Sequence, residues 1–140
     1  MQPAANGQTG DSELSAIRYV PGDDVGALEI WPFDNPASQY RIVAGSPSAS
    51  GRLDAGGGAG DVTRAGIWRC TPGTFECIEQ GDEMMTMLSG ACRLTFHATG
   101  ATYDLMSGDS LFIPGDSRVT WEISATVTKV FFGFKADGYR

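Results

Sequence analysis

Residues 66–90 read GIWRCTPGTFECIEQGDEMMTMLSG, and in this stretch short apolar runs alternate with turn signals. Turn pairs such as Pro72-Gly73 and Gly81-Asp82 have a mechanism, because proline presets φ, glycine supplies positive φ and Asp bonds back to the chain. The pattern continues through residues 107–123 (SGDSLFIPGDSRVTWEI) and 127–134 (VTKVFFGF). Short strands at this spacing, with no helical pattern between them, predict an all-β sandwich or barrel.

The turn signals divide the second half of the chain into predicted strands. These are residues 66–70, 74–79, 83–88, 91–97, 101–106, 110–113, 118–124 and 127–135. Residues 27–33 and 39–44 are two further candidates upstream. The segment between them and the first turn, residues 46–60 (SPSASGRLDAGGGAG), is rich in Gly, Ser and Ala and predicts a flexible surface loop. Whether that loop is a lid over a pocket or plain surface is left open.

The length of 140 residues suits one domain. Residues 1–15 are small and polar without periodicity, so they predict a flexible tail, and residues 16–140 predict a single domain. The N-terminus has no basic cluster followed by an apolar run, and the sequence has no long apolar segment. These features predict a cytoplasmic protein with no signal peptide and no membrane span.

The net charge of the chain bears on its partners, and its cysteines bear on disulfides and zinc. A formal net charge of −7 disfavours nucleic acid and anionic lipid, which bind basic surfaces. We therefore expect no nucleic acid and no membrane among the partners of this protein. Cys70, Cys77 and Cys92 are odd in number and do not form a C-x-x-C pattern, so we expect reduced thiols and no structural zinc.

Side-chain alternation assigns residues to the two faces of each strand. Three sets are predicted to share a face: Phe75, Cys77 and Glu79; Glu83, Met85 and Met87; and Val119, Trp121 and Ile123. The last set is apolar and alternates with polar residues, so Trp121 is expected to point inward.

The motif order from residue 66 to residue 134 resembles the cupin superfamily. More narrowly, it is similar to the small single-domain cupins grouped with the cupin domain of ureidoglycine aminohydrolase and with the ethanolamine-utilisation cupin. The motifs are Trp68-x-Cys70-x-Pro72-Gly73-x-Phe75, Gly81-Asp82-Glu83, Leu88-x-Gly90, Gly108-Asp109-x5-Gly115, Thr120-Trp121-Glu122 and Thr128-Lys129-Val130. The resemblance implies a cupin-type double-stranded β-helix, that is, a jelly-roll barrel, and a homodimer.

The resemblance also implies where a metal would be held. Cupins use two histidines in H-x-H, a glutamate and a later histidine. Counting from Glu83, the places of the first two histidines carry Cys77 and Glu79, and the last carries Val119. The single histidine, His97, is predicted to lie at the rim of the barrel. We therefore predict no metal and no other cofactor, although an oxygen- and sulfur-ligated site made by Cys77, Glu79 and Glu83 stays open.

Glu83 and Glu79 are the candidate catalytic residues. Two nearby carboxylates in an apolar barrel raise the pKa of one of them, which makes that carboxyl a general acid or base near neutral pH. In the alternative interpretation, Glu83 bonds a backbone group or an arginine such as Arg69 or Arg93, and Glu79 points to water.

Phe75, Cys77, Met85, Trp121 and Lys129 are the candidate substrate-binding residues. Trp121 and Phe75 would offer a flat apolar slot to a ligand ring, and Lys129 would pair with a ligand carboxylate or with Glu83. The alternatives are core packing for the apolar residues and a solvated edge for Lys129. Cys77 has no histidine to activate it, so an inert thiol is the simpler role.

These observations lead to three hypotheses of function. The preferred one is a cupin that binds a small polar metabolite in the barrel, with metal-independent acid–base catalysis by a carboxylate as one possibility. One alternative is a metal-assisted, ureidoglycine aminohydrolase-like enzyme. Another is a non-catalytic ligand-binding or regulatory module. The sequence leaves open whether the protein is an enzyme.

Overall fold

The computed structural model describes residues 15–22 and 24–139, and the predicted tail lies outside these residues apart from the exposed Ser15. The strands are β1 (Glu29–Ile30), β2 (Arg41–Gly45), β3 (Ala49–Gly56), β4 (Thr63–Cys70), β5 (Gly73–Ile78), β6 (Asp82–Phe96), β7 (Thr102–Met106), β8 (Ser110–Ile113) and β9 (Arg118–Phe134), with a short 3₁₀ turn, η2 (Pro36–Ser38). This arrangement confirms the all-β prediction. Within the described residues, no helix is long and apolar enough to cross a membrane.

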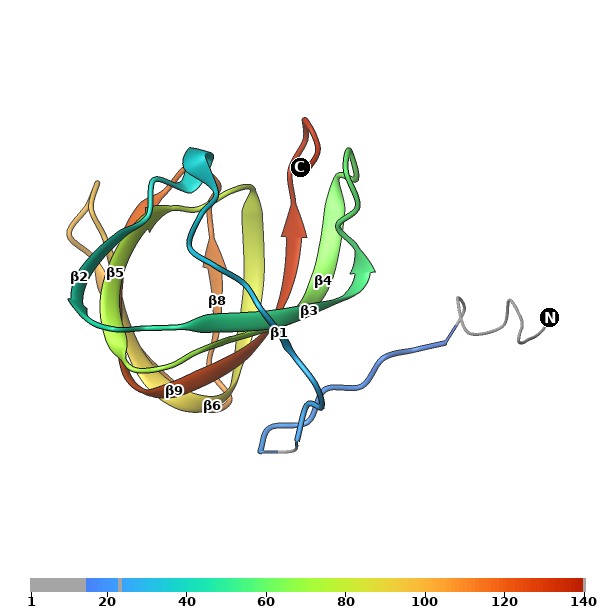
Figure 1. Cartoon of the computed structure of the whole chain (residues 1–140), viewed down its shortest axis with the longest axis horizontal. Helices are drawn as coiled ribbons and strands as arrows, with labels where there is room; N and C mark the ends of the chain where they lie inside the picture. The colour runs from blue at the N-terminus through green and yellow to red at the C-terminus, as the bar shows by residue number, and fades with distance from the viewer. Residues whose placement is uncertain (1–14, 23, 140) are drawn as a thin grey trace.

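Strand β9 organises the sheet, because it has a partner along both edges. One edge pairs antiparallel with β6 for most of its length. The other edge pairs first with β5, over Arg118–Ile123, and then with β4, over Val127–Phe134. The sheet continues through β3 to β1 on one side and through β2 on the other, while β7 and β8 pair with β6. Figure 1 shows these strands curling around a common interior.

Strand β6 corrects one predicted turn. Ser89-Gly90 was expected to separate two strands, but β6 runs unbroken through it with shifts in register on both sides. The inward positions change from Met85 and Met87 before the shift to Cys92 and Leu94 after it. Gly90 makes this bulge possible because its φ is 89°, and a Cβ there would lie 2.1 Å from the carbonyl oxygen of Thr126. Similarly, the two strands predicted over residues 118–135 form the single strand β9.

The predicted loop at residues 46–60 is also wrong, since it contains β3 paired to both β1 and β4. The many small residues of this segment led to the wrong prediction, because Gly, Ser and Ala have low strand propensity. Small residues are nevertheless suited to a strand where a neighbouring side chain lies close to the backbone. A Cβ on Gly51 would lie 2.3 Å from the ring of Trp31. The glycine therefore lets a tryptophan lie flat against the strand, and this part of the chain is wall rather than lid.

Apolar side chains from β4, β5, β6, β8 and β9 fill the interior. Phe75, Ile67, Met85, Met87, Leu94, Ile113, Val119, Trp121 and Val127 are among the largest fully buried residues. The predicted inward faces of β5, of the first part of β6 and of β9 agree with this core. One end of the barrel interior is left open as a cavity, and that end carries the candidate site.

A candidate ligand cavity with a buried ion pair

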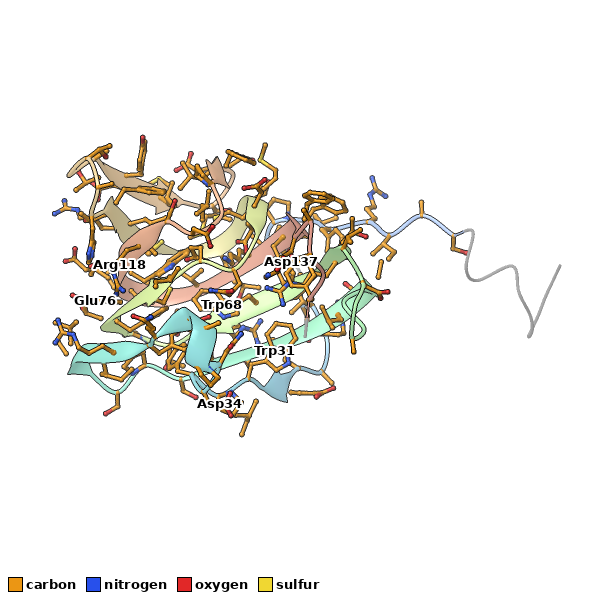
Figure 2. All side chains as sticks on the ribbon, turned by 90° about the horizontal axis from the view of Figure 1, so that it is seen from above. Trp31, Asp34, Trp68, Glu76, Arg118 and Asp137 are labelled. Carbon is orange, nitrogen blue, oxygen red and sulfur yellow. The ribbon has the colours of Figure 1, made fainter. Side chains whose placement is uncertain are left out.

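A cavity of about 280 Å³ opens between η2, β4, β5, β9 and the C-terminal segment. Its walls are strongly aromatic, and eight aromatic residues line it: Trp31, Phe33, Tyr40, Trp68, Phe75, Trp121, Phe131 and Tyr139. Figure 2 labels Trp31 and Trp68, which both line the cavity. Such a volume with aromatic walls suits a small molecule that contains a flat ring.

A buried ion pair lies at the inner end of the cavity. Lys129, on β9, is 4% exposed and donates a hydrogen bond from Nζ to Oε2 of Glu83, on β6. The ammonium also lies 4.9 Å from the ring centroid of Trp68 and 4.7 Å from that of Trp121. Two aromatic faces and one carboxylate therefore replace the water that a lysine normally keeps.

The carboxyl group of Glu79 lies beside this pair, just beyond the end of β5. Its Oε2 accepts a hydrogen bond from Nε1 of Trp121 at 2.9 Å and one from Sγ of Cys77 at 3.6 Å. Burial raises the pKa of Glu79, and the negative charge of Glu83 raises it further, while Lys129 and the two hydrogen bonds oppose the shift. The cavity thus holds one carboxylate that is paired and one carboxyl group that favours its protonated form.

The three thiols are poor nucleophiles in this setting. Cys70, Cys77 and Cys92 are free and buried. Burial raises the pKa of Cys70 to about 12 and that of Cys92 to about 11. Burial, and then the charge of Glu79, raises the pKa of Cys77 well above its usual range. Since the thiolate is the reactive form, Cys77 acts here as a weak hydrogen-bond donor rather than an attacking group.

The residues at the cupin metal positions do not fit a metal. Within the described part of the chain, no group of three or more His, Cys, Asp or Glu side chains is placed to hold one. The ammonium of Lys129 engages Glu83, the indole of Trp121 donates to Glu79, and Cys77 faces the aliphatic Val119 across the β5–β9 pair. A cation supplied by the chain itself is bound to Glu83, and the residues at these positions do not fit a metal.

The structure brings several predicted site residues together. Phe75, Cys77, Glu79, Glu83, Trp121 and Lys129 line the cavity, whereas Met85 is 1% exposed and belongs to the core beneath it. Trp121 and Phe75 are nearly parallel, with centroids 6.4 Å apart.

The alternatives for other residues are also resolved. The arginines considered as partners of Glu83 have other partners, since Arg69 bonds Thr128 and Arg93 pairs with Asp104. His97 is exposed and bonds Thr120, away from the residues that line the cavity.

Sequence reasoning missed the rim of the cavity. Arg64, Lys135 and Tyr139 line it together with Trp31. They meet because the C-terminal segment bonds the β3–β4 loop: the N–H of Gly60 donates to the carbonyl of Tyr139 at 2.8 Å. The alternation of apolar and polar residues along one strand cannot predict such a contact between distant segments. Strand period two does, however, place Arg64 on the same face of β4 as Trp68.

A curled antiparallel sheet that surrounds one interior is the architecture of a cupin-type protein. The chain belongs to the EutQ-like cupin domain family, whose model matches residues 57–131, more than half of the sequence. This match confirms the predicted resemblance to small cupins.

Known proteins agree with the fold. The Clostridium difficile EutQ protein superposes with a TM-score of 0.55 at 17% identity, covering 66% of this chain and 71% of that one. A cupin-like protein from Thermotoga maritima gives a TM-score of 0.59 at 11% identity, covering 81% and 83%. At these identities the similarity establishes the jelly-roll fold alone.

One curated relative carries the name of an activity. A pyrimidine/purine nucleoside phosphorylase from Laribacter hongkongensis (strain HLHK9) is 31% identical over 67 residues. The alignment covers 48% of this chain and 65% of the relative, so the chain spans slightly less than two thirds of that protein.

Proposed function

We propose that this cupin binds a small molecule with a flat ring in its barrel, and that the carboxyl group of Glu79 donates a proton or a hydrogen bond to it. The observation that carries the proposal is the position of Glu79. It lies in the wall of an aromatic cavity, beside an ion pair and under the indole of Trp121. A protonated carboxyl in such a place can act as a general acid near neutral pH.

The roles of the two glutamates follow from their partners. The sequence placed Glu83 first as the catalytic group, but its carboxylate is bound by Lys129. We therefore assign the acid role to Glu79, and a positioning role to Glu83, which holds the ammonium of Lys129 near the ligand. The ring faces of Trp68 and Phe75 supply apolar contact to the ligand.

A second candidate is phosphorolysis of a nucleoside, favoured by the similarity to the curated phosphorylase. In that reaction an oxygen of hydrogen phosphate attacks C1′ of the ribose and the bond from C1′ to the base nitrogen breaks. Glu79 would give its proton to the departing base, and the proton lost by the phosphate would restore the acid. The cavity offers ring contacts for a base and the guanidinium of Arg64 for phosphate.

The test of both candidates is a thermal-shift screen with nucleosides, free bases and small heterocycles, each with and without inorganic phosphate, followed by chromatography of the products. Saturable stabilisation by a ring compound supports the binding proposal. Release of free base that requires phosphate supports the second candidate. If no ring compound raises the thermal midpoint, the binding proposal fails. If nucleosides bind but remain intact, phosphorolysis fails and a non-catalytic binding module remains.

Where turnover is found, Glu79→Gln is expected to lower kcat by about 10²- to 10⁴-fold, because general acid catalysis contributes that much. The amide can still accept the hydrogen bond from Trp121, so the thermal midpoint should stay near that of wild type. The matched control is Glu76→Gln, which lies on the adjoining strand β5 but outside the cavity and is paired with Arg41. Equal kcat values in wild type and Glu79→Gln would exclude the acid role.

Other finer predictions stay proposals. The aminohydrolase alternative needs a metal that the residues present do not fit, so we do not favour it. Three free thiols are consistent with a reducing, cytoplasmic location. The homodimer stays a prediction, which light scattering of the purified protein can test: the mass of one chain would reject it.

A further inference from the structure

Arg64 stands out among the residues at the rim of the cavity. It lies on β4, and its guanidinium carbon is 4.0 Å from the ring centroid of Tyr139 and 5.8 Å from that of Phe131. Tyr139 is itself 5% exposed, so the platform beneath the arginine is part of the packed structure. A guanidinium held over a buried ring has lost part of its rotamer freedom, so less entropy is lost when it binds a ligand.

The other charges of the cavity are paired or suppressed. Glu83 pairs with Lys129, and Lys135 pairs with Asp137 at 2.6 Å. Burial raises the pKa of Glu79, which favours its neutral form. Within the described residues, Arg64 has aromatic partners and forms no ion pair with a carboxylate. The rim therefore carries a positive charge although the whole chain has a net charge of −7.

The ring of Tyr139 lies directly beneath the guanidinium of Arg64. The hydroxyl of Tyr139 is buried and finds no hydrogen-bond partner within the described part of the chain. It packs against Gly133, where a Cβ would lie 2.5 Å from the hydroxyl oxygen. Burying that hydroxyl has a cost. The contact of the Tyr139 ring with Arg64 offsets part of the cost of burying the Tyr139 hydroxyl.

We infer that Arg64 is the anchor of an oxyanion subsite at the rim of the cavity. The ligand class is then a small flat-ring compound that carries a phosphate or carboxylate, or a neutral ring compound bound together with inorganic phosphate. The guanidinium binds two oxygens of the anion side by side, and the ring enters the aromatic cavity toward Glu79. This inference rests on the proposed function, because it takes the cavity to be the ligand site.

Isothermal titration at constant ionic strength tests the inference with three probes: inorganic phosphate, benzoate and uridine 5′-monophosphate. At least one should bind wild type saturably with one site per chain. Arg64→Gln should weaken that binding by about ten- to hundredfold, the usual effect of losing charge-assisted hydrogen bonds. Arg64→Lys, which keeps the charge and loses the fork, should weaken it by less. Which probe binds separates phosphate from carboxylate recognition.

The controls separate this inference from the proposed function. Arg41→Gln removes an exposed arginine outside the cavity and should leave binding unchanged. Tyr139→Phe keeps the ring under Arg64 and should retain binding. If no oxyanion binds wild type, or if Arg64→Gln and Arg64→Lys bind as wild type does, the inference is overturned. A neutral ring compound that still binds Arg64→Gln in that case would leave the proposed function standing.

Discussion

Replacing Lys129 with methionine is expected to lower the free energy of unfolding by about 3–5 kcal/mol, the range found when one partner of a buried ion pair is removed. Methionine has a similar length and keeps the apolar contacts with Trp68 and Trp121. The loss therefore comes from Glu83, whose side chain is 13% exposed and would carry a charge with no counter-ion. Urea unfolding of wild type and variant measures the difference.

The double variant Lys129→Met with Glu83→Gln identifies the cause. Without the glutamate charge, a large part of the lost stability should return, because the unpaired buried charge is gone. Arg93→Met is the matched control, since it breaks an exposed pair with Asp104 and should cost less than about 1 kcal/mol. If Lys129→Met costs no more than this control, the ion pair does not hold the cavity together.

The protonation of Glu79 should appear as a dependence of stability on pH. Its pKa is raised in the folded chain, so the folded chain keeps a proton that the unfolded chain releases. The stability from this group is fully present below the ordinary glutamate pKa of about 4.3 and is lost as pH rises through the raised pKa of the folded state. Wild type should therefore lose stability relative to Glu79→Gln, by up to about 1.4 kcal/mol per pH unit in that window.

Taking the difference between wild type and Glu79→Gln at each pH removes most contributions from other groups. The groups nearest to Glu79 are Glu83, Lys129 and Cys77, and all three are present in both proteins. The unfolding free energy of the variant minus that of wild type should grow from about pH 4.3 upward. A difference that stays flat to pH 8 would show that Glu79 titrates as an ordinary exposed glutamate.

Alternation along single strands was enough to predict the inner wall of the site. Period two placed Cys77 and Glu79 on one face of β5, and the structure has them in the cavity. The same rule places Lys129 in phase with the buried Val127 and Phe131 on β9. The position of Lys129 on the same face as these buried residues was the sequence signal for a buried cation. This signal favours burial of Lys129 over the alternative of a solvated strand edge.

What sequence reasoning could not provide was contact between distant segments. Arg64 follows a glycine-rich stretch and Tyr139 follows the last strand, and they meet through pairing of the C-terminal segment with the β3–β4 loop. The small residues of β3 gave no strand pattern, because the packing of Trp31 on Gly51 selects them. Gly90 signalled positive φ correctly, but a turn and a bulge use glycine for the same reason.

Elemental analysis of wild-type protein, purified without chelators and then dialysed against Mn, Fe, Ni and Zn in turn, addresses the barrel interior most directly. Because the Lys129 ammonium takes the place among Cys77, Glu79 and Glu83 that another cupin would give to a metal, we expect metal content far below one equivalent. A full equivalent retained by wild type and lost in Glu83→Gln would contradict this account.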